Sequence, residues 1–377
     1  AGVAAKAEAQ AEEAQAIEAA SPQQVQQAPM KELLAVEPLE VEIGYALVPL
    51  VDESQNGDLL KRISLTRQKL ALELGIIVPP ARIRDNIQLP ATEYAIKLRG
   101  IKVAGGEVMP RFLLALDTTG GATPIEGIQT TDPSFGMPAV WIAPELRLDA
   151  EAAGYTVVEP STVLSTHLME TVRQHAAELL TRQHTRELLD AVKESHPALV
   201  DDVVPAKLSL GTVHRVLQRL LKEGLPIRDL VSILEALSDG ADQTKDPETL
   251  TEHVRRALGS VILQLFEQGD GSIRGITVGP RLEAALMQLF SPRPLRDGGR
   301  TMDPDELTDA LRRLNELVAA HRQDGHWPAL IAPPSLRVGI RRLVEPVLPK
   351  LPVLSLGELP TQAPILSLAT WELSRAH

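Results

Sequence analysis

Apolar and polar positions change their spacing along the chain, and each spacing predicts a type of element. Residues 39–43 alternate strictly between apolar and polar side chains, as in a half-buried strand. Residues 58–74 carry apolar side chains three or four positions apart, which predicts an amphipathic helix that ends at Gly75. Further strands are predicted at 81–84, 94–99, 112–116, 139–142 and 155–158, with a helix at 145–153.

The spacing becomes mainly helical after Pro160. We predict helices at 161–181, 182–193, 209–221 and 228–237, so that residues 180–258 are almost entirely helical. Strands and helices alternate again from residue 259 to a last strand at 353–354, which is typical of a small α/β unit. The predicted fold class is therefore a mixture of α/β and α+β with one all-helical part.

Two segments read as irregular structure. Residues 118–134 are rich in Gly, Thr and Pro and predict a loop, and the pair Gly105-Gly106 predicts a turn. Residues 1–29 consist mostly of Ala, Glu and Gln, with no apolar stripe that a helix could bury. We expect residues 1–37 to be a flexible linker to another part of the protein.

Composition narrows the class of protein. Hydrophobic residues make up 44% of the 377 residues and charged residues 23%, which favours a folded globular chain. The net charge of −12 argues against a nucleic-acid partner. No run of 18 apolar residues and no signal peptide is present, so we expect the chain as given to be soluble.

Candidate catalytic and metal-binding residues form no coherent set. The absence of cysteine excludes thiol chemistry and Cys-ligated zinc, and the nine histidines show no metal-binding spacing. The glycine pairs lack the residues that hold a phosphate. Arg84-Asp85-Asn86 is either a catalytic acid with its clamp or, as we favour, a turn. The sequence therefore predicts no enzyme, no cofactor and no metal.

The segment Asp132-Pro133-Ser134-Phe135-Gly136 is the strongest candidate for binding. Phe135 is one of only four phenylalanines and lies between loop-forming residues. Such a side chain either plugs the local core or is an exposed contact that a partner covers, and its residue type leaves both open. The neighbouring Asp132 would orient a bound peptide or helix.

Several stretches, each uninformative alone, occur in one order between Leu33 and Leu354. They are 38–45 with 49–52, 83–86, 132–136 with 141–142, 157–159 with 161–163 and 166–168, 226–229, and 352–355. Together they resemble the cytoplasmic part of the FHIPEP family of flagellar type III export-gate proteins. No family stretch matches the residues after Pro360, so 356–377 is expected to be a tail outside the fold.

The resemblance implies a domain organisation. In the family a block of transmembrane helices precedes this region, so the chain would lie at the cytoplasmic face of the bacterial inner membrane, joined to that block by the linker. The family's soluble part has four compact subdomains. By analogy the first covers 38–110 plus 160–179, the second is inserted at 111–159, the third is the helical stretch 180–258, and the fourth is 259–355.

The resemblance also implies docking rather than catalysis. In the family, nine such domains form a ring, and a depression between the first two subdomains receives export chaperones loaded with late substrates such as flagellin and hook-associated proteins. Components of the export ATPase complex and the substrate-specificity switch protein are further implied partners. The chaperone-binding residues correspond to Asp132, Phe135, Thr166, Leu116, Val158 and Val163. This implies that Phe135 is an exposed contact.

Two alternatives belong to other classes. The homologous export gate of a virulence injectisome would share the fold and the ring but serve different chaperones. An α/β enzyme of unknown substrate is the more distant alternative, and a bound cofactor or a metal requirement would distinguish it.

Overall fold

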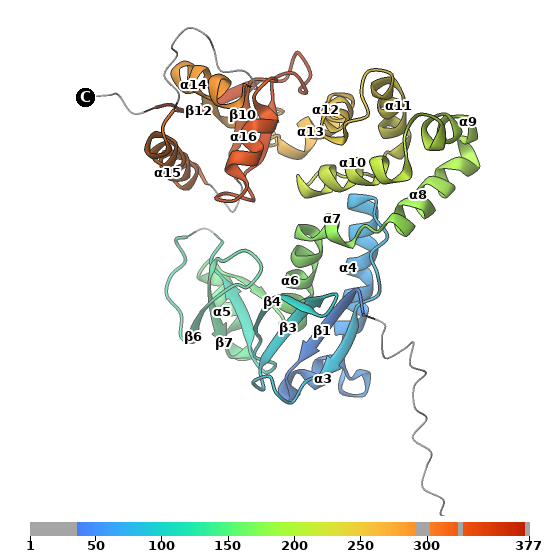
Figure 1. Cartoon of the computed structure of the whole chain (residues 1–377). Helices are drawn as coiled ribbons and strands as arrows, with labels where there is room; N and C mark the ends of the chain where they lie inside the picture. The colour runs from blue at the N-terminus through green and yellow to red at the C-terminus, as the bar shows by residue number, and fades with distance from the viewer. Residues whose placement is uncertain (1–35, 119, 292–301, 323–326, 374–377) are drawn as a thin grey trace, which may run out of the picture.

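The computed structural model describes residues 36–118, 120–291, 302–322 and 327–373 (Figure 1). Residues 1–35 of the predicted linker lie outside the described residues, as do the last four residues. Three four-stranded sheets and a run of helices make up the described chain, which is the mixed α/β class that the sequence predicts. No helix among the described ranges combines the length and the apolar character needed to cross a bilayer.

The first sheet has the strand order β2-β1-β3-β4. Its β1 is the strictly alternating segment, and β2 pairs with it in parallel while β3 pairs antiparallel. Helix α4 packs against α6 beside this sheet (Figure 1). The elements are β1 (Leu39–Ile43), η1 (Tyr45–Leu47), α3 (Val48–Val51), η2 (Glu53–Gln55), α4 (Leu59–Leu74), β2 (Arg82–Asp85), β3 (Glu93–Leu98), β4 (Ile101–Glu107), α6 (Pro160–Gln174) and α7 (Ala176–Leu179).

Two predictions in this part are wrong. Gly105 and Gly106 lie inside β4, paired with Ala95 and Tyr94 of β3, rather than in a turn. The single helix expected at 161–181 is two helices, because the chain leaves helical geometry at His175. The end of α4 is as predicted. Gly75 has a φ of 75°, and an added Cβ there would lie 2.4 Å from the backbone of Arg228.

The second sheet has the order β6-β7-β5-β8 and is antiparallel throughout. Trp141 of β7 is buried, and its partner in β5 is Leu114. Strand β6 falls within 118–134, so the prediction of one continuous loop there is wrong. The elements are β5 (Leu113–Leu116), β6 (Ile128–Thr131), β7 (Pro138–Ile142), η3 (Pro144–Leu146), α5 (Arg147–Ala152) and β8 (Thr156–Val158).

Residues 182–266, the helical part, consist mostly of helices, as predicted for 180–258. Side-chain caps define several of their starts: Ser209 accepts a hydrogen bond from the backbone N–H of Thr212, and Asp229 accepts one from that of Ser232. The elements are α8 (Arg182–Ser195), α9 (Pro197–Asp201), η4 (Asp202–Lys207), α10 (Leu210–Lys222), α11 (Leu230–Ala241), α12 (Pro247–Ala257) and α13 (Gly259–Phe266).

The third sheet, of order β11-β10-β9-β12, is parallel throughout. The prediction that 356–377 is a tail outside the fold is wrong, because β12 forms an edge of this sheet beside β9. Trp371 of β12 is fully buried, and its Nε1–H donates to the carbonyl of Ala310 at 2.7 Å. The elements are β9 (Ile273–Val278), α14 (Pro280–Phe290), α15 (Pro304–His321), β10 (Ala329–Ala332), α16 (Arg337–Val344), β11 (Val353–Ser355) and β12 (Ile365–Trp371).

The buried side chains form three clusters. The largest is continuous from β1 through α4 and α6 into the helical part, and it reaches one face of the third sheet. A second cluster packs α14, α15 and α16 on the other face of the third sheet, and a small third cluster lies between the second sheet and α5. The first sheet and the helical part thus share one core, and the boundaries of the four subdomains stay predictions.

Candidate functional site

Phe135 lies on a tight loop between β6 and β7. The backbone N–H of Asp132 donates to the carbonyl of Met137 at 2.9 Å, and that of Gly136 donates back to the carbonyl of Asp132 at 2.9 Å. Gly136 has a φ of 71°, a conformation that favours glycine. Phe135 itself is 45% exposed and belongs to none of the buried clusters. The loop therefore presents an aromatic side chain to the surface.

The structure places Asp132 beneath the loop that carries Phe135. Asp132 is only 5% exposed, so the protein itself covers most of its surface. One carboxylate oxygen, Oδ2, accepts the backbone N–H of Phe135 at 2.7 Å. Burial raises the pKa of Asp132, although hydrogen bonds from the backbone of Phe135 and Ser134 act to lower it. The carboxylate thus fixes the loop that carries the aromatic ring.

A buried pair of polar side chains lies close to this loop. The hydroxyl of Tyr94 in β3 is 2.6 Å from Nδ1 of His167 in α6, and the two rings meet edge to face at 5.7 Å between centroids. Burial raises the pKa of Tyr94, and the charge of Asp132 raises it further. Burial also lowers the pKa of His167. The hydroxyl therefore stays protonated and can donate a hydrogen bond to the neutral imidazole.

Gly106 of β4 allows the loop to approach Tyr94. A Cβ at Gly106 would lie 3.0 Å from the Tyr94 hydroxyl oxygen and 3.2 Å from Cβ of Pro133. The first sheet and the loop of the second sheet are thus in close contact at this glycine. Sequence reasoning did not assign Tyr94, His167 or Gly106 to the site. The period-two pattern of β3 places Tyr94 on the buried face, but nothing in the sequence pairs it with a histidine 73 positions away.

The other predicted residues lie on three neighbouring elements. Leu116 ends β5, where it pairs with Ala139 of β7, and Val158 ends β8. Both are half-buried against the largest core cluster. Thr166 is half-buried on α6, which packs on β5. Val163 is only 3% exposed and is part of the core behind these residues.

The other residues considered for catalysis or metal binding make structural contacts in the described part of the chain. Nε of Arg84 lies 3.0 Å from a carboxylate oxygen of Glu40, and the amide of Asn86 donates to Glu42 at 2.9 Å. These contacts hold β2 and the turn that follows it against β1. They agree with the structural role that we favoured for Arg84-Asp85-Asn86. Across the described ranges, no three His, Asp or Glu side chains are close enough to share a metal ion.

Comparison with known proteins identifies a family along nearly the whole chain. The model of the FHIPEP family matches residues 1–364. "Flagellar biosynthesis protein FlhA" of Bacillus subtilis (strain 168) is 40% identical over 363 residues, which are 96% of this chain and 53% of that relative. The chain spans about half the length of the curated relatives it matches.

Solved structures with the same fold come from type III secretion proteins. One of them is the structure of the Chlamydia pneumoniae CdsV and CdsO protein complex. One of its chains is similar to this chain with a TM-score of 0.78 and 25% identity, and the match covers 89% of this chain and 98% of that one. The nonameric EPEC SctV-C structure has a TM-score of 0.71 and 21% identity, covering 89% of this chain and 99% of that one.

Proposed function

The chain belongs to the FHIPEP family, and from that premise we propose that it is the docking platform of a flagellar type III export gate. It binds complexes of export chaperones with late substrates and so helps to order export during flagellum assembly. The observation that carries this proposal is Phe135, a large aromatic side chain held 45% exposed on a loop whose own carboxylate is buried to fix it.

Sequence similarity favours the flagellar gate over the injectisome gate. The flagellar relative is 40% identical to this chain, whereas the two secretion-system structures are 25% and 21% identical. We therefore propose flagellin and hook-associated proteins, with their chaperones, as the cargo.

The proposed docking surface joins the loop to the elements beside it. Phe135 supplies the aromatic contact, while Leu116, Val158 and Thr166 are half-buried and keep part of their surface open to a partner. A shallow apolar surface with one aromatic anchor suits the helix-in-groove mode of binding. Asp132 and Val163 act from beneath, the first on the loop and the second on the core.

The wider setting is proposed from the family and its relatives. We propose a ring of this chain, since a relative with the same fold is titled nonameric. Partners in the export ATPase complex are supported by the complex of CdsV with CdsO, and a specificity-switch protein is proposed by resemblance alone. The chain acts at the cytoplasmic face of the inner membrane, without catalysis and without a cofactor.

The domain boundaries are proposed with one change. The first subdomain covers 38–110 plus 160–179, the second 111–159 and the third 180–258. The fourth begins at 259 and extends at least to Trp371, because β12 is part of its sheet and Trp371 is part of its core.

Isothermal titration with a flagellin–chaperone complex from the same organism tests the proposal. The test variant is Phe135→Ala, and the matched control is Met287→Ala on α14, where another large apolar side chain is 50% exposed. Loss of an interface anchor weakens binding by about 2 kcal/mol or more. We expect this loss in Phe135→Ala alone, with its melting temperature nearly unchanged.

Two results would contradict the proposal. Equal affinity of the wild type and Phe135→Ala would remove Phe135 from the binding surface. A large fall in melting temperature on its substitution would mean that the ring is part of the core.

A further inference from the structure

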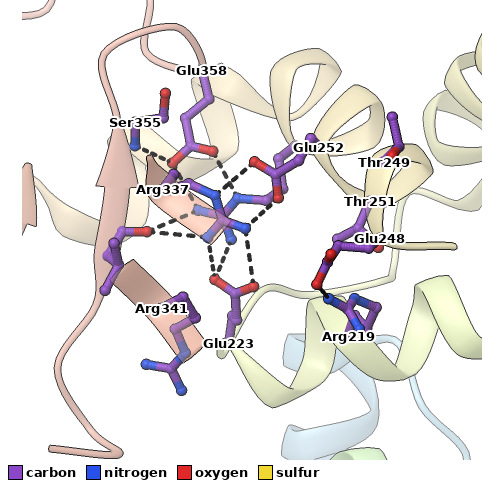
Figure 2. A network of polar contacts seen from close by, with 12 residues as sticks. Arg219, Glu223, Glu248, Thr249, Thr251, Glu252, Arg337, Arg341, Ser355 and Glu358 are labelled. Atoms are coloured by element: carbon purple, nitrogen blue, oxygen red, sulfur yellow. Dashed lines mark hydrogen bonds and ion pairs between the residues drawn. The ribbon is translucent and has the colours of Figure 1, made fainter. Parts of the chain in front are cut away.

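A buried network of ion pairs joins the helical part to the third sheet (Figure 2). The guanidinium of Arg337 donates to Glu223 at 2.7 Å and to Glu252, and that of Arg255 donates to Glu358 at 2.7 Å. Both arginines are at most 2% exposed. The network brings α10, α12 and α16 together around one polar centre.

A cavity of about 240 Å³ opens beside this network, between α10, α12 and α16. Eight of the side chains that line it are charged. The cations are Arg219, Lys222, Arg337, Arg341 and Arg342. The carboxylates are Glu223, Glu248 and Glu345. The lining therefore has an excess of two positive charges, in a chain whose net charge is −12.

Each carboxylate of the lining is shared between two cations. Glu248 pairs with both Arg219 and Arg342, and Glu345 pairs with Lys222 and, at 3.9 Å, with Arg341. Glu223, the third carboxylate, serves Arg337 at 2.7 Å and Arg255 of the buried network at 3.0 Å. With Arg255, Glu252 and Glu358 of the adjoining buried network included, six cations face five carboxylates, which leaves an excess of one positive charge.

Arg341 provides an independent observation. It is 8% exposed, and its two terminal nitrogens donate to the carbonyls of Leu351 at 2.9 Å and Pro349 at 3.2 Å. Its Nε has no hydrogen-bond partner among the described residues, and the Glu345 carboxylate that pairs with it stays at 3.9 Å, beyond hydrogen-bond distance. A buried guanidinium with an unused donor is costly unless an acceptor satisfies it. An arginine of this kind, lining a positively charged cavity, indicates a place for an anionic ligand.

We propose that this cavity binds a phosphate group, either free phosphate or the terminal phosphate of a nucleotide. A phosphate group carries negative charge at neutral pH, opposite in sign to the excess around the cavity. Guanidinium groups donate paired hydrogen bonds to its oxygens, and the ammonium of Lys222 adds a point charge. The volume holds a phosphate with several waters, since one water occupies about 30 Å³ of liquid.

A phosphate bound in this cavity would stabilise the junction between the helical part and the last subdomain, because it would contact helices from both. The ligand would contact α10 through Arg219 and Lys222 and α16 through Arg342. These cations lie at the open side, where side-chain exposure is 42%, 61% and 68%. Because they are not part of the buried network, they can be replaced without removing its ion pairs.

Calorimetric titration of the chain with inorganic phosphate at low ionic strength tests this inference. The test variant is Lys222→Gln/Arg342→Gln, and the matched control is Arg186→Gln/Arg215→Gln, which removes the same charge from exposed positions of α8 and α10 outside the cavity. We expect binding in the millimolar range or tighter, weakened roughly tenfold in the test variant and unchanged in the control. Arg219→Gln should weaken it independently.

Three outcomes distinguish the possibilities. No heat of binding with wild type up to about 10 mM phosphate overturns the inference. Equal weakening in both double variants also overturns it, because it indicates only a general charge effect. A parallel titration with ATP identifies the source: tighter binding than phosphate with the same variant dependence assigns a nucleotide, and weaker binding assigns the free ion.

Discussion

Two regions of the described chain bury charged side chains in opposite ways. Near Phe135, the single carboxylate of Asp132 is buried with backbone N–H donors, and its pKa is raised. At the junction, the buried ion-pair network between the helical part and the third sheet, burial alone would raise the pKa of Glu223. The charges of Arg255 and Arg337 outweigh the effect of burial and hold that pKa below its usual value. The junction is therefore a set of mutually dependent ions, whereas the docking loop depends on hydrogen bonds.

This difference suits the proposed roles of the two regions. Buried charges in a network cannot be separated without leaving an uncompensated ion, so the junction between the helical part and the third sheet is held firmly. The loop is held by individual hydrogen bonds, each worth far less. A surface that receives several partners benefits from such a locally adjustable loop on a fixed scaffold.

Replacing Arg255 should produce the largest effect. Arg255→Met leaves Glu358 buried without its guanidinium partner and takes one of two partners from Glu223. Breaking a buried ion pair by removing one side costs about 3–5 kcal/mol of unfolding free energy. Urea unfolding followed by the fluorescence of Trp327 and Trp371, in a Trp141→Phe background, measures the change. A loss below about 1 kcal/mol would mean that the network contributes no more than surface pairs do.

Removing the Tyr94 hydroxyl should produce a smaller, local effect. Tyr94→Phe leaves Nδ1 of His167 buried without its hydrogen-bond partner, which costs about 1–3 kcal/mol. We expect faster amide hydrogen exchange at Phe135 and Gly136, whose N–H groups donate within the loop, and unchanged exchange in α14. Unchanged exchange in the loop would show that the Tyr94–His167 pair does not support the loop.

The pH dependence should distinguish the two regions further. The folded pKa of His167 is lowered from 6.5, so the stability that the neutral imidazole contributes is present above pH 6.5 and is lost as pH falls through the lower folded value. The melting temperature of wild type relative to His167→Gln should therefore decrease from pH 7.5 to about pH 5. Asp132 is present in both proteins, so its opposite contribution largely cancels. A constant difference across this range would contradict the direction assigned to His167.

The smallest effect is expected at the rim of the junction. Arg342 pairs with Glu248, but its side chain is 68% exposed. Arg342→Ala should change the unfolding free energy by at most about 1 kcal/mol, because exposed ion pairs contribute little. The same urea experiment provides the measurement. A loss as large as that of Arg255→Met would show that the buried and exposed pairs form one cooperative unit.

Local pattern was sufficient for much of the fold. The alternation of 39–43 and the Gly75 end of α4 predicted elements that the structure contains, because neighbouring residues alone decide them. Gly105 and Gly106 were mistaken for a turn, since the reason for glycine there is the approach of Tyr94 and Pro133 from distant parts of the chain. The apolar run of β12 was overlooked because the family stretches end before it.

The details of both polar clusters were beyond sequence reasoning. Asp132 was predicted to bind a partner, and the sequence did not indicate its burial or its hydrogen bond to the backbone of Phe135. The pairs of Arg255 with Glu358 and of Arg337 with Glu223 join residues 103 and 114 positions apart. Pairing across such separations depends on how the sheets and helices pack, which no local pattern encodes.

The central claim is that a chaperone–substrate complex covers the Phe135 loop. Hydrogen–deuterium exchange of the wild-type chain, with and without a flagellin–chaperone complex, tests it without altering any residue. We expect slower exchange on binding at residues 132–137 and at the end of β5, with no change in α14 or at the ion-pair junction. Protection confined to the helical part or the third sheet, with the loop unchanged, would contradict it.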